Sequence, residues 1–366
     1  LLRHLILKLG FIMNVTDKIS FNKLLLESEC ITDSIYSIDD VMQWITNRNR
    51  EMLVNIKKIP LETCTGWTHD NQSGFIRNKT NSFFKIAGLT YQNGFKAIQQ
   101  PILIQDEIGY LGILCSKING VLHFLMQAKI EPGNVNCNQL SPTIQATRSN
   151  FLCKHGGRVP EYLSYFINAS ASNIVVDQIQ SEQSSRFLGK RNRNTIIYVG
   201  DYKKIEVSDS HKWLSLGQIR ALMRIDNIVN MDSRTVLSCI PYSSLSQISP
   251  NKFCPLFNSV YKQSDYASFC SLTKKINDYK MFDESVTKIV PLSSLSDWSF
   301  VNNEFVSKIN YPFKVIFCEI EIEGREVRHW CQPLFEATGK ATFALIYRDD
   351  FCDNTRRFFF FQAEDG

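Results

Sequence analysis

The amino-acid sequence predicts an α+β fold in which one unit occurs twice along the chain. Three observations lead to this prediction. A helical pattern near the N-terminus gives way to a run of short strands, and segments of the first half recur in order near the C-terminal end. The length of 366 residues also exceeds what one hydrophobic core normally holds.

Helical patterns occupy three parts of the chain. Residues 17–55 carry apolar side chains at three- and four-residue spacing, with a helix expected to begin after Asp33 or Ser34. Residues 159–170 and 215–230 are also expected to be helical. In the last of these, Ser215 followed three residues later by Gln218 predicts a capping box.

Strand patterns fill the region between Phe83 and Lys129. Its apolar segments are short, rich in β-branched and aromatic residues, and separated by turn residues. The dipeptides Asn93-Gly94 and Asn119-Gly120 are strong hairpin signals, because both residue types tolerate the positive φ of a tight turn. We therefore expect two antiparallel hairpins here. The predicted strands are residues 83–91, 96–105, 110–117 and 120–129.

The internal repeat sets the expected domain organisation. The sequence "IPLETCTGWT" recurs as "VPLSSLSDWS", "QQPIL" as "CQPLF" and "FLMQAK" as "FFFQAE". We interpret these matches as two copies of one α+β unit joined by a helical connector. The expected domains are residues 13–210, with Met13 as a possible start, and residues 211–366. The second copy is expected to be truncated at its C-terminus, because the first continues well beyond its matching strand.

Composition excludes several classes of protein. Hydrophobic residues make up 44% and charged residues 21% of the chain, which is ordinary for a folded soluble protein. A net charge of +5 is too small to indicate nucleic-acid binding. No apolar run approaches the roughly 18–20 residues that a membrane span needs. We expect neither a nucleic-acid partner nor a membrane partner.

The cysteine pattern indicates a reducing compartment. The chain has eleven cysteines, and even the closest pair, Cys318 and Cys331, is too far apart for a CxxC motif. Structural zinc sites usually need such a motif, and disulfide frameworks belong to small secreted chains. Scattered thiols therefore predict a cytoplasmic protein.

One predicted strand ends in a column of polar groups. Because side chains alternate along a strand, Gln127, Lys129 and Glu131 share one face, while Met126 and its apolar neighbours share the other. An edge strand with a solvated face would give this pattern, and so would a polar pocket wall. The polar stretch that follows, residues 126–151, must satisfy its own hydrogen-bonding groups or those of a ligand.

A basic cluster in residues 179–194 leaves two interpretations open. Its arginines and lysine lie among amides and hydroxyls, which suits a phosphate or diphosphate because guanidinium groups bind phosphate oxygens in pairs. A solvated basic loop would have the same composition. The members are Arg186, Lys190, Arg191 and Arg193.

These segments together resemble the NDP-hexose 2,3-dehydratase family. The resemblance is carried by "GVLHFLMQAKIEPGNVNCNQLSPTIQATRSNF", "QSEQSSRFLGKRNRN", "LGQIRALMRIDNIVNMDSRTVLSCIP" and "EVRHWCQPLF", and it extends over essentially the whole chain from Ile59. It implies two Nudix-like domains that arose by duplication, usually in a homodimer. It also implies two nucleotide-sugar pockets per subunit, one of them catalytic, and a dTDP-4-keto-6-deoxyhexose as substrate.

The implied reaction removes the C2 hydroxyl of the sugar after proton abstraction at C3. It needs a general base, an acid for the departing water and stabilisation of an enolate oxygen. It needs no cofactor and no metal, because the C4 ketone serves as the electron sink. The nearest match to a Nudix metal motif, Gly324-Arg325-Glu326, lacks the trailing glutamates that would hold magnesium, which disfavours diphosphate hydrolysis.

Lys129, Glu131 and Gln127 are the candidate catalytic residues. Lys129 could stabilise the enolate or act as a base, although a structural Lys129–Glu131 pair is an equal alternative. His123 shares their column, but a lone histidine among apolar neighbours is more often a core residue. For Trp67 and Trp298 a structural role and a ligand contact are equally open. The candidate substrate-binding residues are Trp67, Gln145, Arg148, Ser149, Asn150, Phe151, Ser184, Arg191, Trp298, Arg328 and Gln332.

Two other functions fit parts of the pattern. A protein could keep the nucleotide-sugar pocket without the chemistry, and would then bind the sugar nucleotide unchanged. A Nudix-type diphosphohydrolase would instead release dTMP or a sugar phosphate in the presence of magnesium. The dehydratase is the function that the family resemblance favours.

Overall fold

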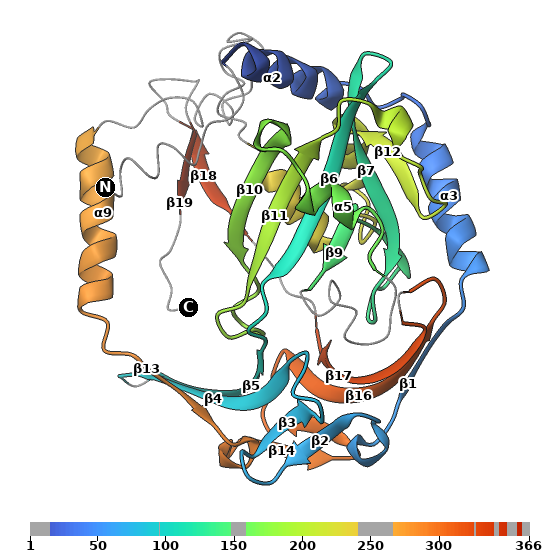
Figure 1. Ribbon diagram of the computed structural model, residues 1–366. Helices are drawn as coiled ribbons and strands as arrows, with labels where there is room; N and C mark the ends of the chain where they lie inside the picture. The colour runs from blue at the N-terminus through green and yellow to red at the C-terminus, as the bar shows by residue number, and fades with distance from the viewer. Residues whose placement is uncertain are drawn as a thin grey trace.

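The protein has a mixed α+β architecture with two β-rich parts (Figure 1). The computed structural model describes residues 15–94, 96–147, 159–240, 266–325, 327–339, 344–349 and 357–360. One part is a seven-stranded sheet that carries most of the helices. The other consists of two five-stranded sheets, drawn together at the bottom of Figure 1.

The seven-stranded sheet has the main order β10-β11-β6-β7-β12. β8 pairs with β7 and β9 pairs with β6. β7 lies between β6 and β12, so it is bordered on both sides. β11 runs parallel to β6, whereas β6–β7 and β7–β12 are antiparallel. The strands are β6 (Gly109–Ile118), β7 (Val121–Ile130), β8 (Asn138–Ser141), β9 (Ile144–Ala146), β10 (Ile174–Ser181), β11 (Arg191–Tyr198) and β12 (His211–Ser215).

This arrangement corrects one interpretation of the polar column. β7 is not an edge strand, and apolar side chains are buried on both of its faces. Phe124 and Met126 pack into the core beneath the helices, while Leu125 packs into a second cluster on the opposite face. Val121 and Gln127 are half-buried, and every other residue of β7 is buried, Lys129 included.

Helices cover one face of the seven-stranded sheet. Their apolar sides join β6, β7 and β11 in the largest hydrophobic cluster, which extends from Phe21 to Ile240. A smaller helix contributes Leu163 and Phe166 to the cluster on the other face. The helices are α2 (Val15–Glu29), α3 (Ile38–Glu51), α5 (Leu163–Ile167), α6 (Leu216–Leu222) and α7 (Met231–Ser238).

Capping explains where two of these helices begin. The predicted capping box of Ser215 and Gln218 is confirmed at the start of α6. The predicted start of the earlier helix was wrong, because α3 begins at Ile38 with Ser37 and Asp40 as its capping box. Ser34 instead places its hydroxyl 2.8 Å from Nε2 of His123 in β7.

Both predicted hairpins are present. β4 (Lys85–Asn93) pairs antiparallel with β5 (Lys96–Ile104), and β6 pairs antiparallel with β7. Asn119 and Gly120 have φ angles of 49° and 88°, as a tight two-residue turn requires. The strand boundaries lie within two residues of the predicted ones.

The two five-stranded sheets exchange strands with each other. β1 pairs with β16 of the distant segment, and β13 of that segment pairs with β4. Each sheet therefore contains strands from both sides of the expected domain boundary at residue 210. The additional strands are β1 (Val54–Lys58), β2 (Trp67–Asp70), β3 (Phe75–Asn78), β13 (Val286–Val290), β14 (Trp298–Val301), β15 (Glu304–Ser307), β16 (Phe313–Ile322) and β17 (His329–Ala337).

The order of elements is the same in both segments. A strand, a 3-10 turn and four further strands follow one another from β1 to β5 and again from β13 to β17, with the turns at η1 (Leu61–Thr63) and η5 (Leu292–Ser294). The short β18 (Ile346–Asp349) and β19 (Arg357–Phe360) pair antiparallel after them. Helix α9 (Tyr266–Met281) precedes the second series and exposes its apolar side chains.

Two tryptophans join the five-stranded sheets through matching contacts. Trp67 donates its indole N–H to the backbone oxygen of Cys331 at 2.8 Å, and Trp298 donates to that of Gln99 at 3.0 Å. Gln99 and Cys331 are themselves matched in the sequence repeat. Both indoles are about 95% buried in one shared core. These contacts favour the structural alternative for both residues.

Replacing either tryptophan by phenylalanine should therefore cost similar stability. Each change leaves a half-buried carbonyl without its indole donor, which typically costs about 1–2 kcal/mol. Urea unfolding of W67F and W298F should show this loss. W44F is the control, because Trp44 donates to Asp209 at the surface, where water can replace the bond. An unchanged W298F would contradict the structural role.

One further contact brings the two parts together at the end of β7. Ile130 packs against Ile316, Ile320 and Ile322 of β16. Arg325, in the turn after β16, donates from Nη1 to the backbone oxygen of Ile130 at 2.9 Å. The polar end of β7 thus lies at the junction of the seven-stranded sheet and a five-stranded sheet.

Among the described helices, none combines the length and apolar composition that crossing a bilayer requires.

Candidate functional site

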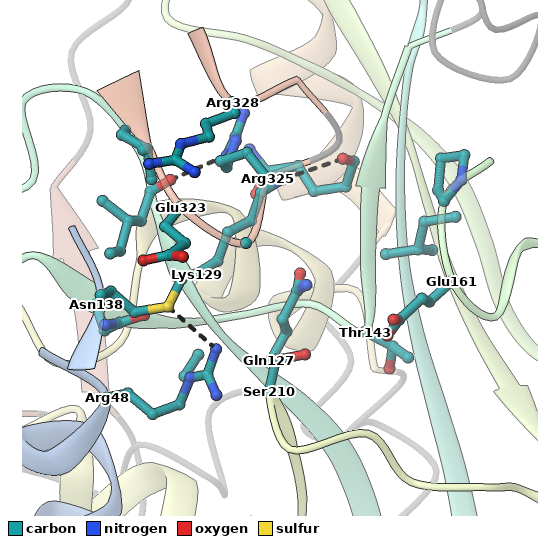
Figure 2. Close-up of a pocket in the computed structure, with 18 of the residues that line it drawn as sticks. Arg48, Gln127, Lys129, Asn138, Thr143, Glu161, Ser210, Glu323, Arg325 and Arg328 are labelled. Carbon is teal, nitrogen blue, oxygen red and sulfur yellow. Dashed lines mark hydrogen bonds between the residues drawn. The ribbon is translucent and has the colours of Figure 1, made fainter. Parts of the chain in front are cut away.

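A polar cavity of about 400 Å³ opens beside the end of β7. Figure 2 shows side chains from both parts of the molecule lining it. Gln127 and Lys129 come from β7, Arg48 from α3, and Arg325 and Arg328 from the segment between β16 and β17. The fold therefore brings together Arg48 and Arg328, which are 280 positions apart in the sequence.

A second cavity of about 220 Å³ adjoins the first. Lys129, Gln145 and Arg325 line both, so they form the wall between the two spaces. We name these spaces the larger and the smaller cavity. The smaller cavity is also lined by Glu131, Glu182, Lys190, Asn192 and Asp232.

Lys129 is held by two contacts in this shared wall. Its ammonium donates to the backbone oxygen of Gln145 at 3.2 Å and lies 3.1 Å from Oε1 of Glu131. Only 8% of its side chain is exposed. An ammonium has three hydrogens, so these two contacts leave one for a ligand in either cavity.

Glu131 is paired with two cations. Besides Lys129, Nη1 of Arg325 donates to its Oε1 at 2.8 Å. Burial raises the pKa of Glu131, but the charges of Arg325 and Lys129 more than offset this effect and lower the pKa to about 2. A carboxyl with this pKa remains an anion at neutral pH and is a weak base. The structure thus favours Glu131 as the anchor of Lys129 and Arg325.

The larger cavity contains cations with capacity to bind an anion. Nε of Arg48 is buried and has no hydrogen-bond partner within the described part of the chain. Arg325 and Arg328 line the same space, together with the carboxylates Glu161 and Glu323. A buried guanidinium nitrogen without a partner is costly unless a ligand or water completes its hydrogen bonding.

Gln145 is a predicted binding residue that the structure places well. Its Oε1 is buried and has no hydrogen-bond partner among the described residues. Because Gln145 lines both cavities, this oxygen can accept a hydrogen bond from a hydroxyl of a bound ligand.

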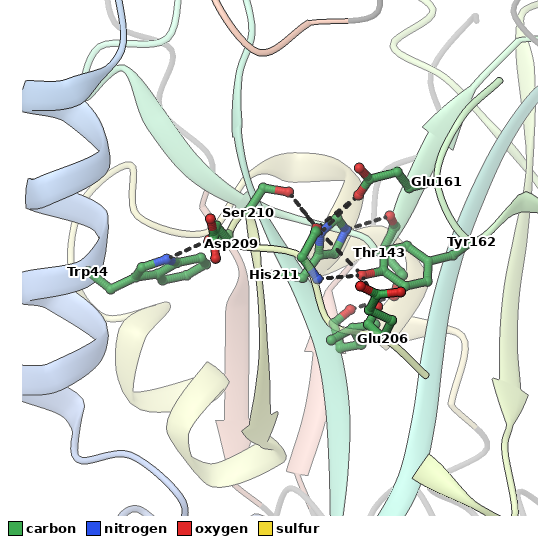
Figure 3. Close-up of polar contacts among 10 residues, drawn as sticks. Trp44, Thr143, Glu161, Tyr162, Glu206, Asp209, Ser210 and His211 are labelled. Atoms are coloured by element: carbon green, nitrogen blue, oxygen red, sulfur yellow. Dashed lines mark hydrogen bonds and ion pairs between the residues drawn. The ribbon is translucent and has the colours of Figure 1, made fainter. Parts of the chain in front are cut away.

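His211 forms a buried polar cluster behind the larger cavity (Figure 3). Its Nε2 lies 3.1 Å from the backbone oxygen of Thr143, which can only accept, so Nε2 carries the hydrogen. Nδ1 then accepts from the hydroxyl of Ser210 at 2.9 Å, because the hydroxyl of Ser208, also 2.9 Å away, donates its hydrogen to Glu161. Burial lowers the pKa of His211 to about 4, so the ring is neutral at pH 7 and positions Ser210 in the cavity wall.

The other buried histidine, His123, is a core residue as expected. Its ring is fully buried, with Nδ1 3.0 Å from the backbone oxygen of Val121. Burial lowers its pKa. It lines neither cavity.

Several predicted binding residues lie away from the two cavities. Gln332 accepts a hydrogen bond from Trp330 within β17, and Ser184 and Arg191 are exposed without lining either cavity. Arg328 does line the larger cavity, although it also pairs with Glu321 at 3.1 Å. Arg148, Ser149, Asn150 and Phe151 lie outside the described residues.

The basic cluster of residues 179–194 is divided among different contacts. Arg186 stacks over the ring of Phe313 at 3.9 Å, and Arg193 pairs with Asp177 at 2.6 Å. Lys190 alone reaches the smaller cavity, where it donates to the backbone oxygen of Glu107. These side chains do not converge on one phosphate.

Several lining residues were not identified from the sequence, and three of them are charged residues of the proposed site. Arg48, Arg325 and Asp232 come from α3, from the turn after β16 and from α7, and each of these elements has an ordinary local pattern. Arg325 had been noted only as part of an incomplete metal motif. The described residues contain no group of three or more histidine, cysteine, aspartate or glutamate side chains arranged to hold a metal ion.

Comparison with known proteins identifies the family. The family model described as NDP-hexose 2,3-dehydratase matches residues 38–240 and 271–365. The chain belongs to this family. The resemblance inferred from the residues is thereby confirmed over most of the sequence.

Curated members of the NDP-hexose 2,3-dehydratase family are similar across most of this chain. Proteins from Saccharopolyspora spinosa and Amycolatopsis orientalis are 37% and 36% identical over 317 and 330 residues, which is 83% and 88% of this chain. Both are named dTDP-4-dehydro-6-deoxy-alpha-D-glucopyranose 2,3-dehydratase. The matches cover 64% and 66% of those relatives, so this chain spans slightly less than two thirds of their length.

A solved structure titled "Crystal structure of ADP compounds hydrolase" is also similar to part of this family member. It matches 54% of this chain and 96% of its own, with 8% identity and a TM-score of 0.29. A likeness this weak carries no argument about fold or activity.

Proposed function

We propose that this protein removes the C2 hydroxyl of a dTDP-4-keto-6-deoxyhexose as a nucleotide-sugar 2,3-dehydratase. Membership of the family and the names of the curated relatives support this activity. The structural observation that carries it is the pair of adjoining cavities with Lys129, Gln145 and Arg325 in their common wall. This arrangement suits a ligand that has an anionic part and a hydroxylated part.

The proposed elimination suits the buried ammonium of Lys129 in the wall between the two cavities. Loss of the C3 proton places negative charge on the C4 oxygen, and the remaining ammonium hydrogen of Lys129 can stabilise that charge. The C2–O bond then breaks, and the enol at C3 rearranges to a 3,4-diketo-2,6-dideoxyhexose. The ketone of the substrate takes up the electron pair, so the elimination requires no redox cofactor.

The larger cavity is the proposed site for the diphosphate. Arg48, Arg325 and Arg328 bring three guanidinium groups to it, and guanidinium groups bind phosphate oxygens through paired hydrogen bonds. Gln127, in the same lining, can hydrogen-bond to the ligand. The smaller cavity then takes the sugar, next to Lys129 and the unpartnered oxygen of Gln145.

The duplication is also part of the proposal. The matching order of elements and the reciprocal contacts of Trp67 and Trp298 support two copies of one Nudix-like unit. Domains at residues 13–210 and 211–366 are proposed from the sequence repeat, although β12, α6 and α7 follow residue 210 and still complete the seven-stranded sheet and its core. A homodimer is proposed from the family resemblance, and light scattering in solution tests it. Every cysteine in the described part is a free thiol, which supports a cytoplasmic location.

Mass spectrometry provides the direct test. Purified protein is incubated with dTDP-4-keto-6-deoxyglucose, without added metal or nicotinamide. Loss of one water, or the breakdown products of an unstable diketo sugar, is the expected result. Tight binding of an unchanged sugar nucleotide would instead indicate a binding protein without the chemistry. Magnesium-dependent release of dTMP or sugar phosphate would indicate a hydrolase.

Arg48→Gln tests the proposed diphosphate site. Removal of one charge-assisted hydrogen bond typically costs about 1.5–3 kcal/mol, which corresponds to a dissociation constant for dTDP more than tenfold higher. Calorimetry with dTDP measures this change. Arg50→Gln is the matched control, because Arg50 lies on the same helix but is exposed and outside both cavities. Equal affinities for the two variants would exclude Arg48 from the site.

A further inference from the structure

Asp232 lies at the start of α7 and lines the smaller cavity. The N-cap of this helix is already satisfied, because Asn230 accepts from the backbone N–H of Ser233 at 2.8 Å. The carboxylate of Asp232 therefore has no capping role. It makes no hydrogen bond or ion pair with any side chain or backbone group in the described part of the chain.

Every other charged group around the smaller cavity has a partner. Glu131 holds Lys129 and Arg325, Glu182 accepts from Asn192, and Lys190 donates to the backbone oxygen of Glu107. Among the lining residues that the structure describes, Asp232 is thus the charged group without a protein partner, beside Lys129 with its one remaining hydrogen. Its side chain is half-buried and its carboxylate oxygens are not fully enclosed by protein, so a ligand in the cavity can reach them.

Burial and the neighbouring charges also change the pKa of Asp232. Burial raises the pKa of Asp232, the negative charges of Glu182 and Glu131 raise it further, and Lys129 lowers it, giving a pKa of about 7. Both protonation states are therefore populated at neutral pH. A group that must first accept and then donate a proton works best under this condition.

We propose that Asp232 is the acid–base residue of the dehydration, accepting the C3 proton and returning it to the departing C2 hydroxyl. This role rests on the proposed function and extends it to a named residue. Its support is positional: Asp232 and Lys129 line the same small cavity, so a sugar bound there meets an unpartnered carboxylate and an ammonium together.

One carboxylate is enough to carry out both proton transfers of the reaction. Asp232 removes the proton from C3, and the electron pair of the C3–H bond moves onto the C4 oxygen beside Lys129. When the C4 carbonyl re-forms, a double bond forms between C2 and C3 and the C2–O bond breaks. The proton on Asp232 passes to the leaving hydroxide as water, which restores the carboxylate. In a gluco-configured sugar the C3 hydrogen and the C2 hydroxyl lie on the same face, so one residue can reach both.

Asp232→Asn is the first test. We expect kcat to fall at least 100-fold, because general acid–base groups typically contribute 10²–10⁴-fold, while the dissociation constant of dTDP stays within about twofold. Asp226→Asn makes the same chemical change at an exposed position outside both cavities and should keep full activity. Turnover of D232N within fivefold of the parent protein would overturn the assignment.

A pH profile distinguishes proton transfer from a structural role. As a base, Asp232 must be ionised, so kcat should be present above a pH of about 7 and decline as the pH falls through it. Because the charge of Glu182 raises the pKa of Asp232, E182Q should move this acidic limb to lower pH. The charged groups that face Asp232 in the cavity are Glu131, Glu182, Lys129, Lys190 and Arg325.

The outcomes separate this assignment from the proposed function. A parent protein that dehydrates the sugar, with an E182Q profile that is not displaced, would overturn the role of Asp232 alone. That comparison decides the question even if D232N does not fold. A parent protein that binds the sugar nucleotide without dehydrating it would remove the proposed function, and the role of Asp232 with it.

Discussion

Lys129→Met is expected to lower turnover by about 10²–10³-fold. This is the usual cost of removing one donor that stabilises a developing oxyanion. Methionine keeps most of the length and the apolar character of the lysine stem but loses the charge that lies between the two cavities. The backbone oxygen of Gln145 loses its donor in the same change. Steady-state kinetics with the sugar nucleotide would measure the loss.

A second lysine provides the control for a lost ion pair. Lys314 in β16 is partly buried and pairs with Glu304 at 2.6 Å and with Glu336 at 3.2 Å, but it lines neither cavity. K314M should reduce stability and leave turnover close to that of the parent protein. If K129M likewise lost only stability, Lys129 would be a structural partner of Glu131, which is the alternative that the sequence left open.

The predicted part of the site comes from one strand and its neighbour. Alternation along β7 placed Gln127 and Lys129 on one face, and the structure brings both to a cavity with Gln145. Local pattern was sufficient here because β7 and β9 are close in sequence and both pair within one sheet. Glu131 was also placed correctly beside Lys129, although its low pKa now argues for an anchoring role.

The rest of the site could not be read from local patterns. Arg48 is a charged residue of the kind found on the surface of any amphipathic helix. Asp232 is an acidic residue of the kind common in the first turn of any helix. Arg325 reaches the site only because β16 packs against the end of β7 through Ile130. Periodicity reports which face of an element is buried, but it does not report which distant element covers that face.

The pairing of strands between the two five-stranded sheets could not be predicted from local patterns either. The repeat predicted two similar sheets, yet β1 pairs with β16 and β13 pairs with β4. Val54 was included in a helical segment, although it begins the strand β1. β1 depends on pairing partners more than 250 residues away, such as Ile322 opposite Val54 (322 − 54 = 268), and no local propensity encodes that pairing.

Glu131→Gln is expected to remove most of the acid sensitivity of this site. The pKa of Glu131 is about 2 in the folded protein and 4.5 in its ordinary setting. A lowered folded-state pKa stabilises the protein above the unfolded value, so this contribution is present above pH 4.5 and is lost as the pH falls towards 2. At about 1.4 kcal/mol for each pH unit, its upper bound is about 3 kcal/mol. The side chain is 30% exposed, so solvent reduces that value.

Urea unfolding at several pH values measures this contribution. At pH 7 the parent protein should be more stable than E131Q by up to about 3 kcal/mol, and the difference should shrink towards zero as the pH approaches 2. Glu62→Gln alters an exposed carboxylate and should track the parent protein throughout. A difference that stayed constant with pH would mean that the loss comes from packing, because only the titration of Glu131 makes it disappear in acid. Combined with K129M, E131Q should cost less than the sum of the single changes, since the two groups neutralise each other in the shared wall.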